Sequence, residues 1–413
     1  MKNTNIIPVL IGADLNCYNL ARAFHEACGV VSYAFGRYEI GATKASRIVR
    51  FHTVEQMDSD AVFLEELTRF AQEHRAENTA MIALGCTDDY ANMLSRHKAE
   101  LEALGYIVPY NDIALMDEFA SKERFYDFCE KHQIPYPNTS IVHTLEECTL
   151  QRFEEAHLGF SYPIVVKPAN SIVYWKHPFE QMHKVYFADT PQQAMEICRT
   201  IFGSGYDDSI ILQDTIPGND SHMYVLTAYC GQDKKVRMMC LGHVLLEEHT
   251  PKGKGNHAAI ITEYNPELCQ RFKDFLEDIG YVGFANFDIK YDERDGSYRA
   301  FEINLRQGRS NYYVTAAGAN IAQCLLDDYI EHKPAPEQYL VKNEHFWSYI
   351  PKQVVYRYAR NPKLVAKAKA LEKSGAFSSS LWYHYDMKGN PVRFFYSAAN
   401  GLNHFKKYRK YMK

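Results

Sequence analysis

Two short stretches decide the fold: residues 284–291 read FANFDIKY and residues 299–304 read RAFEIN. Each alternates apolar and polar residues with the period of two that is typical of a β-strand, and a turn near Arg294 predicts that they pair as a hairpin. The apolar face, which we expect to contact a core, carries Phe287, Ile289, Phe301 and Ile303. The opposite face carries Asp288, Glu302 and Asn304.

This polar face predicts a metal site. Two carboxylates in one small patch repel each other unless a cation lies between them. Oxygen ligands from Asp288, Glu302 and Asn304, with room left for phosphate oxygens and water, suit Mg²⁺ better than zinc. The alternative is a solvated outer face of an edge hairpin.

Two lysines precede the hairpin. Lys167 ends an apolar strand predicted over residues 161–167, and Lys122 opens a helix predicted over residues 121–132. An ammonium group at a buried strand end needs an anionic partner or must lose its charge. The pair therefore suggests a phosphate clamp, although lysines that extend to the surface would give the same pattern.

A third feature is the strand predicted over residues 209–214, which stops in the turn Pro217-Gly218. Such a turn leaves main-chain groups free to contact a flat base edge, and Asp220 is free to accept from ribose hydroxyls. An ordinary strand and turn would look the same.

The chain before residue 115 alternates strands and helices, which predicts a parallel α/β domain. A ligand would lie at the carboxyl ends of its strands, near Gly12-Ala13-Asp14 and Gly85-Cys86-Thr87. This part includes a helix predicted over residues 90–104. From residue 121 onward the pattern becomes mixed α+β with antiparallel pairing, including strands over residues 223–229 and 236–248.

In this order the segments resemble the ATP-grasp superfamily over about residues 120–310. Residues 6–22, 33–35 and 43–49 look like the start of bacterial carboxylate-amine ligases, a group that includes D-aspartate ligases. The resemblance implies an α/β fold of ATP-grasp architecture. It divides the chain into an N-terminal pre-ATP-grasp domain (1–120), an ATP-grasp domain (121–335, with lobes of about 121–213 and 214–335) and a basic C-terminal extension (336–413).

The resemblance also implies roles for single residues. Lys122 and Lys167 would contact the phosphates of ATP, and Asp220 its ribose. Main chain at Gln213, Asp214 and Ile216 would hold adenine, and two Mg²⁺ would lie on Asp288, Glu302 and Asn304. Two features depart from the family pattern. Bulky Tyr174-Trp175 stands where the flap is often rich in glycine, and Gln213 and Asp220 replace glutamates.

Beyond these ligands, Arg306 and Arg309 follow Asn304 closely enough to fork a substrate carboxylate or to steady the transferring phosphate. Ordinary ion pairing to surface acids is the alternative. Weaker candidates for the same role are Arg237, Lys252 and Lys254.

The predicted function is an ATP-dependent, Mg²⁺-requiring carboxylate-amine ligase that forms an amide through an acyl phosphate. The acid is expected to be D-aspartate or a similar amino acid, and the acceptor the side-chain amine of a peptidoglycan precursor. Alternatives are a ligase that makes a dipeptide or another small amide, a phosphotransferase, and an inactive nucleotide-binding regulator. The sequence leaves the acid, the acceptor and the oligomeric state open.

Charge is distributed unevenly along the chain. The net charge is −5, yet the chain from Lys352 onward carries fourteen Lys and Arg and two acids, Glu372 and Asp386. This basic tail is either a solvated helical face or a surface that attracts an anionic substrate or an anionic membrane. With no signal peptide and no long apolar run, we expect a cytoplasmic protein without a transmembrane segment. The acidic body disfavours nucleic-acid binding.

Overall fold

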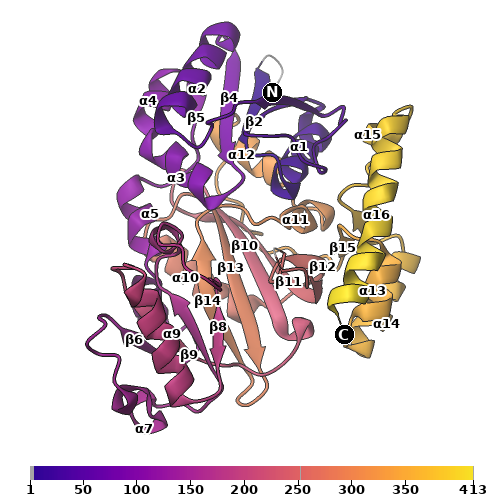
Figure 1. Cartoon of the computed structure of the whole chain (residues 1–413). Helices are drawn as coiled ribbons and strands as arrows, with labels where there is room; N and C mark the ends of the chain where they lie inside the picture. The colour runs from indigo at the N-terminus through magenta and orange to yellow at the C-terminus, as the bar shows by residue number, and fades with distance from the viewer. Residues whose placement is uncertain (1–3, 252, 413) are drawn as a thin grey trace. The chain divides into compact units, whose positions relative to one another are not determined.

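A parallel sheet carries the N-terminal part of the chain (Figure 1). The computed structural model describes residues 4–251 and 253–412. The sheet has the strand order β3-β2-β1-β4-β5, and its strands are β1 (Asn5–Ile11), β2 (Ser32–Gly36), β3 (Val49–Thr53), β4 (Thr79–Gly85) and β5 (Tyr106–Ile107). The two central strands, β1 and β4, are almost continuously buried, as strands covered on both faces must be. The predicted parallel α/β arrangement is therefore present.

Helices connect these strands: α1 (Leu15–Cys28), α2 (Asp60–His74), α3 (Asp88–Arg96) and α4 (Lys98–Ala103), followed by α5 (Ile113–Ala120). The single helix predicted over residues 90–104 is wrong, because the chain breaks at His97. The His97 ring lies 3.0 Å from Asp60 and 2.7 Å from Glu100, and these contacts hold the break in place.

The chain forms two compact units. Unit 1 consists of three segments: the chain up to Met116, the segment Asn219–Ile289 and the chain from Ile303 onward. Unit 2 consists of Asp117–Gly218 and Lys290–Glu302. Unit 2 contains a four-stranded sheet of order β6-β9-β7-β8, whose paired strands are all antiparallel. Its elements are α6 (Lys122–Lys131), β6 (Thr139–Val142), η1 (Leu150–Phe153), α7 (Glu155–Leu158), β7 (Ile164–Pro168), α8 (Ser171–Tyr174), β8 (Tyr186–Ala188), α9 (Pro191–Gly203) and β9 (Ile210–Asp214).

The core of unit 2 lies between this sheet and α9. Val166 and Leu212 of the sheet, together with Cys198 and Ile201 of α9, are fully buried. The apolar strands predicted around Lys167 and before Gln213 are therefore strands in the structure.

A third sheet has the order β14-β13-β10-β11-β12-β15-β16. Its strands are β10 (Met223–Cys230), β11 (Val236–Glu247), β12 (His257–Glu263), β13 (Gly283–Asp292), β14 (Ser297–Asn304), β15 (Phe346–Ser348) and β16 (Phe377–Ser379). Strand β12 was not predicted. The helices of this part of the chain are η2 (Asp220–His222), α10 (Pro266–Asp278), α11 (Tyr312–Ala316), α12 (Ile321–Tyr329), α13 (Lys352–Tyr358), α14 (Pro362–Lys373), α15 (His384–Met387) and α16 (Pro391–Tyr411).

The hairpin that decided the prediction is β13 and β14. Phe287, Ile289 and Ile303 are buried, as predicted, whereas Phe301 is only half-buried. The base of the hairpin belongs to unit 1 and its tip, Lys290–Glu302, to unit 2. Among the described residues, no helix is both long enough and apolar enough to cross a membrane.

A buried ion pair anchors the C-terminal helices within unit 1. Asp386 and Arg393 are both fully buried, and the Arg393 Nε lies 3.1 Å from the Asp386 carboxylate. The same carboxylate accepts hydrogen bonds from the Tyr18 hydroxyl (2.9 Å), the Ser46 hydroxyl (3.0 Å) and the Arg47 N–H (2.6 Å). The tail is therefore attached to the first helix and to the loop before β3.

Replacing Asp386 by Asn should lower the free energy of unfolding by about 3 kcal/mol, because it leaves the buried Arg393 guanidinium without its counter-charge. Urea unfolding followed by circular dichroism measures the change. The control is Asp58→Asn, which breaks the exposed Arg37–Asp58 pair and should cost at most about 1 kcal/mol. Equal losses in the two variants would contradict the anchoring role.

Candidate active site

Three lysines surround one carboxylate in unit 2. The Lys122 Nζ lies 3.6 Å from the Glu302 carboxylate, and the charges of Lys184 and Lys167 also act on it. Burial alone would raise the pKa of Glu302, but Lys122, Lys184 and Lys167 outweigh it and hold that pKa at about 2. Glu302 is therefore ionised, and the cluster keeps an excess of positive charge that suits a polyanion.

Lys167 is the most perturbed of these groups. Burial, together with the charges of Lys122 and Lys184, lowers its pKa to about 7, and the opposing charge of Glu302 does not compensate. A polyphosphate placed against this amine would restore its usual protonation, because the anion favours the charged form. The two lysines predicted from the sequence thus share one site with the Glu302 carboxylate.

Sequence reasoning missed Lys184 as a site residue. Strand β8 pairs antiparallel with β7, with Tyr186 opposite Val166. This register carries the chain before β8, which includes Lys184, toward the end of β7, where Lys167 lies. The third lysine could have been found only once that pairing was known.

The predicted adenine hinge at the end of β9 is held by polar contacts. The Gln213 side chain donates to the Tyr126 hydroxyl (2.8 Å) and to the Thr139 hydroxyl (2.9 Å). The Asp214 N–H donates to the Asn138 carbonyl at 2.9 Å. The hinge is therefore fixed to α6 and to the start of β6.

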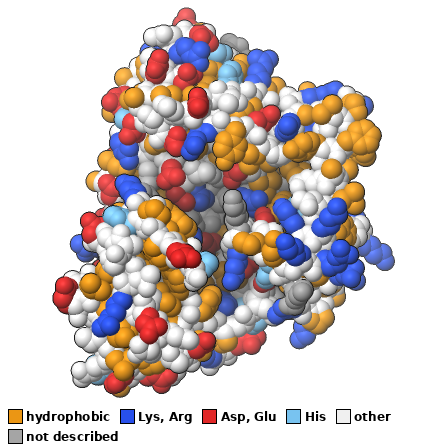
Figure 2. Space-filling model, in the orientation of Figure 1, with side chains coloured by type: hydrophobic (Ala, Val, Ile, Leu, Met, Phe, Trp, Pro, Cys, Tyr) orange, Lys and Arg blue, Asp and Glu red, His pale blue; other side chains and the backbone are white. Residues whose placement is uncertain are grey.

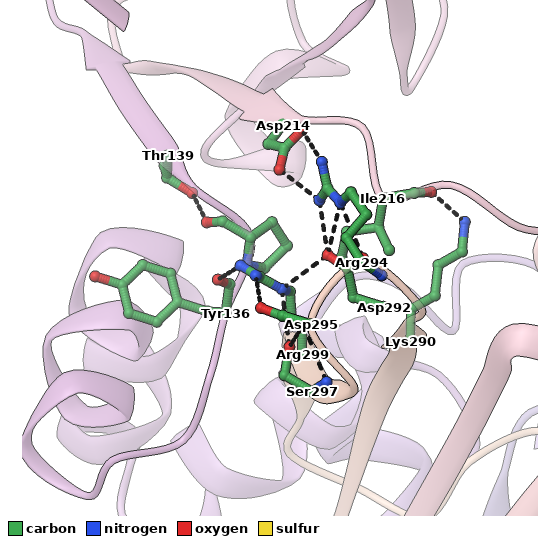
Figure 3. A network of polar contacts seen from close by, with 11 residues as sticks. Tyr136, Thr139, Asp214, Ile216, Lys290, Asp292, Arg294, Asp295, Ser297 and Arg299 are labelled. Carbon is green, nitrogen blue, oxygen red and sulfur yellow. Dashed lines mark hydrogen bonds and ion pairs between the residues drawn. The ribbon is translucent and has the colours of Figure 1, made fainter. Parts of the chain in front are cut away.

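Two basic side chains from the tip of the hairpin also hold this hinge (Figure 3). Arg294 forks the Asp214 carboxylate with N–O distances of 3.1 and 2.6 Å and pairs with Asp292 on its other side. Lys290 donates to the Ile216 carbonyl at 2.7 Å. A base at this hinge must therefore use a donor other than the Asp214 N–H, whereas the Ile216 carbonyl keeps a second lone pair that could accept from it.

Asp220, the predicted ribose ligand, lies in unit 1. Its carboxylate accepts from the Glu247 N–H (3.0 Å) and contacts the His249 Nε2 (2.8 Å). Burial would raise the pKa of Asp220, but His249 and the Glu247 N–H lower it below its usual value. The carboxylate is thus ionised and oriented, and it retains lone pairs for a hydroxyl. Nothing in the sequence pointed to His249.

Two of the predicted metal ligands meet in unit 1. The Asn304 Nδ2 donates to the Asp288 carboxylate at 3.2 Å and to the Asn286 carbonyl at 3.3 Å. Within the part of the chain that the structure describes, no group of three or more His, Cys, Asp and Glu is placed to hold a metal ion. A set of two carboxylates and one amide has the oxygen chemistry that Mg²⁺ accepts, since Mg²⁺ keeps several positions for water and phosphate.

Arg306 and Arg309 both form ion pairs in unit 1. Arg306 forks Asp88, with its Nε 2.9 Å and its second nitrogen 3.0 Å from the two carboxylate oxygens. Arg309 lies 3.0 Å from the Glu248 carboxylate and 4.9 Å from the centre of the Tyr349 ring. The alternative prediction, that both arginines form ordinary ion pairs with acidic side chains, is therefore met. A substrate that binds to these guanidiniums must share them with Asp88 and Glu248.

The carboxylate of Asp14 lies within range of both arginines. Burial raises its pKa, while Arg309 and then Arg306 oppose that rise. Asp14 follows β1 and Asp88 follows β4, so the arginines stand at the carboxyl ends of these parallel strands. This is the position in which a ligand was expected from the sequence.

A buried network fixes the loop that carries the arginines. The Asn16 amide donates to the Cys86 carbonyl (2.8 Å) and the Gln307 carbonyl (3.2 Å), and it accepts from Asn311 (2.6 Å). Gln307 in turn donates to the Gly85 carbonyl at 2.8 Å. The start of α1 and the end of β4 thereby determine where this loop lies.

Three weaker candidates, Arg237, Lys252 and Lys254, were predicted for the same role as the two arginines. Arg237 is paired with Asp233 (3.0 Å) and Asp328 (3.2 Å). Lys254 lies in the turn before β12, and Lys252 falls outside the described residues.

Comparison with known proteins decides the family. The chain is 39% identical over 414 residues to the D-aspartate ligase of Enterococcus faecium, which covers 99% of this chain and 98% of that protein. The chain belongs to the D-aspartate ligase family. No family model matches it.

Solved structures show the fold. The L-amino acid ligase of Bacillus licheniformis matches with a TM-score of 0.51 and 14% identity, over 76% of this chain and 70% of that one. The biotin carboxylase domain of the Hydrogenobacter thermophilus 2-oxoglutarate carboxylase, crystallised with MgADP, ADP and bicarbonate, matches with a TM-score of 0.55 and 14% identity, over 82% and 73%. The predicted ATP-grasp fold and the prediction of a carboxylate-amine ligase are confirmed.

The low pKa of Lys167 predicts proton uptake when a polyphosphate binds. At about pH 8, above its pKa of about 7, the free amine is mostly neutral, and a bound anion should draw in close to one proton. At about pH 6 the amine is already charged and the uptake should nearly vanish. Calorimetry of Mg-ATP binding in buffers of different ionisation enthalpy measures this number.

Lys167→Arg keeps the charge and should bind without the extra proton, because a guanidinium stays protonated at both pH values. The matched control is Lys273→Arg in α10, which should behave like the unmodified protein. Uptake that persists in Lys167→Arg would show that another group takes the proton.

Arg309→Ala and Arg306→Ala should each lower kcat/KM by roughly a hundredfold and leave Mg-ATP affinity nearly unchanged, since both residues are proposed to contact the acid substrate or the transferring phosphate. The control is Arg96→Ala, which removes the exposed ion pair with Asp60 in the same unit. Full turnover in both active-site variants would remove these arginines from the mechanism.

Proposed function

We propose that this ligase uses ATP and Mg²⁺ to activate the carboxylate of D-aspartate and joins it to the side-chain amine of a peptidoglycan precursor peptide in the cytoplasm. The observation that carries the proposal is the 39% identity to a D-aspartate ligase over nearly the whole of both chains. The cluster of Lys122, Lys167, Lys184 and Glu302 supports the use of a nucleotide polyphosphate.

The first step places two anions together, the γ-phosphate of ATP and a carboxylate. Lys122 and Lys167 would neutralise the phosphates, and the charge of Glu302, 3.6 Å from the Lys122 Nζ, helps to hold both ammonium groups in position. Such preorganised charge lowers the barrier because the protein does not have to rearrange as the reaction proceeds. The carboxylate takes the γ-phosphoryl group, so the products of this step are an acyl phosphate and ADP.

Mg²⁺ would be held by Asp288, Glu302 and Asn304 and would supply charge neutralisation for the phosphate oxygens. Asn304 already contacts the Asp288 carboxylate, which orients that ligand. Glu302 stays ionised over the whole physiological range, because its pKa is about 2, and is therefore ready to accept a cation.

Arg306 and Arg309 are proposed to hold the carboxylates of the amino acid. Each is fixed by a carboxylate of the protein, Asp88 and Glu248. Asp88 accepts a hydrogen bond from one terminal nitrogen of Arg306 and lies 2.9 Å from its Nε, so this ion pair restricts the rotation of the guanidinium. A bound acid would therefore meet donors that are already oriented.

In the second step an amine attacks the carbonyl carbon of the acyl phosphate, which forms the amide bond and releases phosphate. A lysine-type side-chain amine has an ordinary pKa near 10.4, so it must lose a proton before it can act as a nucleophile. The carboxylates that flank the arginines, including Asp14 with its raised pKa, are the basic groups that this part of unit 1 offers.

The test is ADP release with Mg-ATP across D- and L-aspartate, D- and L-asparagine and D- and L-alanine, each with and without a nucleotide-linked peptidoglycan pentapeptide. We expect ADP only when D-aspartate and the pentapeptide are both present, together with a product whose mass is the sum of the two minus water. Amide formation with a second free amino acid instead would make the enzyme a dipeptide ligase. ADP release without an amide product would contradict the proposal.

A further inference from the structure

Helix α16 has an unusual distribution of side chains. Its inward face carries Arg393, Ser397, His404 and Tyr408, all buried. Its outward face carries Val392, Phe395 and Leu402, which are 62%, 70% and 66% exposed. The spacing of three and then seven residues keeps these three on one side of the helix. As far as Leu402, the helix thus presents large apolar side chains to the surroundings, while the polar Arg393 and Ser397 face the protein.

The outward apolar side chains extend into a larger aromatic patch. Phe394 is 45% exposed and Trp382, on the segment before α15, is 46% exposed. The Trp382 and Phe394 rings lie 5.4 Å apart, and the Phe394 and Phe395 rings lie 5.8 Å apart. Figure 2 shows hydrophobic side chains gathered over the first part of α16 and blue side chains over its last part. A contiguous apolar surface of this kind marks a contact site.

The same outward face becomes basic toward the end of the helix. Lys406, Arg409 and Lys410 are exposed, and they continue the line that Val392, Phe395 and Leu402 begin. From residue 374 to the end the sequence contains a single acid, Asp386, and that side chain is fully buried in its contacts with Arg393. The exposed surface of this segment therefore carries positive charge that no exposed carboxylate of its own offsets.

We propose that α16 is an interfacial helix that binds the surface of an anionic lipid bilayer. Val392, Phe395 and Leu402 would enter the boundary between headgroups and acyl chains, with Trp382 at headgroup level. Lys406, Arg409 and Lys410 would pair with anionic headgroups. This charge complementarity distinguishes a bilayer from a neutral apolar partner.

A second copy of the chain fits the same face poorly. A two-fold axis that pairs two such helices antiparallel along their whole length sets the apolar half of one against the basic half of the other. A parallel pairing sets Arg409 and Lys410 against the same residues of the partner copy, where like charges repel. A lipid surface meets both halves at once.

The inward face links this surface to the candidate site in unit 1. The Tyr408 hydroxyl donates to the Glu247 carbonyl at 2.6 Å, and the Glu247 N–H donates to Asp220 at 3.0 Å. Burial, with Lys407 and Arg309, lowers the pKa of His404 to about 4, so its imidazole stays neutral beside Arg309. Binding at a bilayer would hold this part of unit 1 close to the lipid surface.

The experiment is flotation of the full-length protein with vesicles of phosphatidylcholine, either alone or mixed with phosphatidylglycerol. We expect the protein to float with the mixed vesicles, to float far less with phosphatidylcholine alone, and to be released by added salt. The double variant Phe395→Ser with Leu402→Ser should bind at least about tenfold more weakly. The triple variant Lys406→Gln, Arg409→Gln and Lys410→Gln should lose its dependence on phosphatidylglycerol.

The matched control is Phe187→Ser with Leu150→Ser, which removes an exposed Phe and an exposed Leu from unit 2 (57% and 47% exposed) and should float like the unmodified protein. Mg-ATP binding by every variant verifies folding. Absence of flotation with mixed vesicles, or equal flotation of the two double variants, would overturn the proposal. So would a concentration-dependent dimer in sedimentation equilibrium that Phe395→Ser with Leu402→Ser abolishes, because it would assign the face to a second copy.

Discussion

The buried amide network around Asn16 is the constraint on which the unit 1 site depends. Asn16 and Gln307 bind main-chain carbonyls at Cys86 and Gly85, so a loop distant in sequence is tied to the ends of two parallel strands. Buried amides tolerate little change, because an unsatisfied one costs more free energy than its hydrogen bond contributes. Gly308 follows Gln307 for a related reason: a Cβ there would lie 2.6 Å from the Asn286 side chain. Because Gln307 and Gly308 are fixed in this way, the positions of Arg306 and Arg309 in the same loop are fixed as well.

The two units present charge in different ways. In unit 2, three lysines surround the single Glu302 carboxylate, so this cluster has a net positive charge that favours binding of an anion. In unit 1, each arginine has its own acid, Asp88 or Glu248, so the guanidiniums are oriented and nearly neutralised. Net positive charge attracts a polyphosphate whatever its orientation. Oriented guanidinium N–H donors can instead distinguish between small acids whose carboxylates differ in position.

Local sequence patterns predicted most of the strands and their ATP-grasp order, because alternating apolar and polar residues and continuous apolar runs can be recognised in a single sequence. The hairpin of β13 and β14 is the clearest case, and Lys122 and Lys167 do share a site with Glu302. Contacts between distant segments leave no such pattern in the sequence. Lys184 comes close to Lys167 through the pairing of β7 with β8, and His249 contacts Asp220 from a loop. The sequence indicated a turn at Arg294 but not its bond to Asp214. The break at His97 arises from contacts with Asp60, which helical periodicity does not contain.

The Asp386 carboxylate has a consequence for how the chain is made. It completes hydrogen bonds to Tyr18 and Arg47, which precede it by 368 and 339 residues. The loop before β3 can reach its native contacts only after almost the entire polypeptide has left the ribosome. Long-range closure of this kind slows folding and leaves early segments exposed while synthesis continues. A chain that stops before α15 therefore lacks more than a tail, because unit 1 would lose contacts that its first helix and the loop before β3 make.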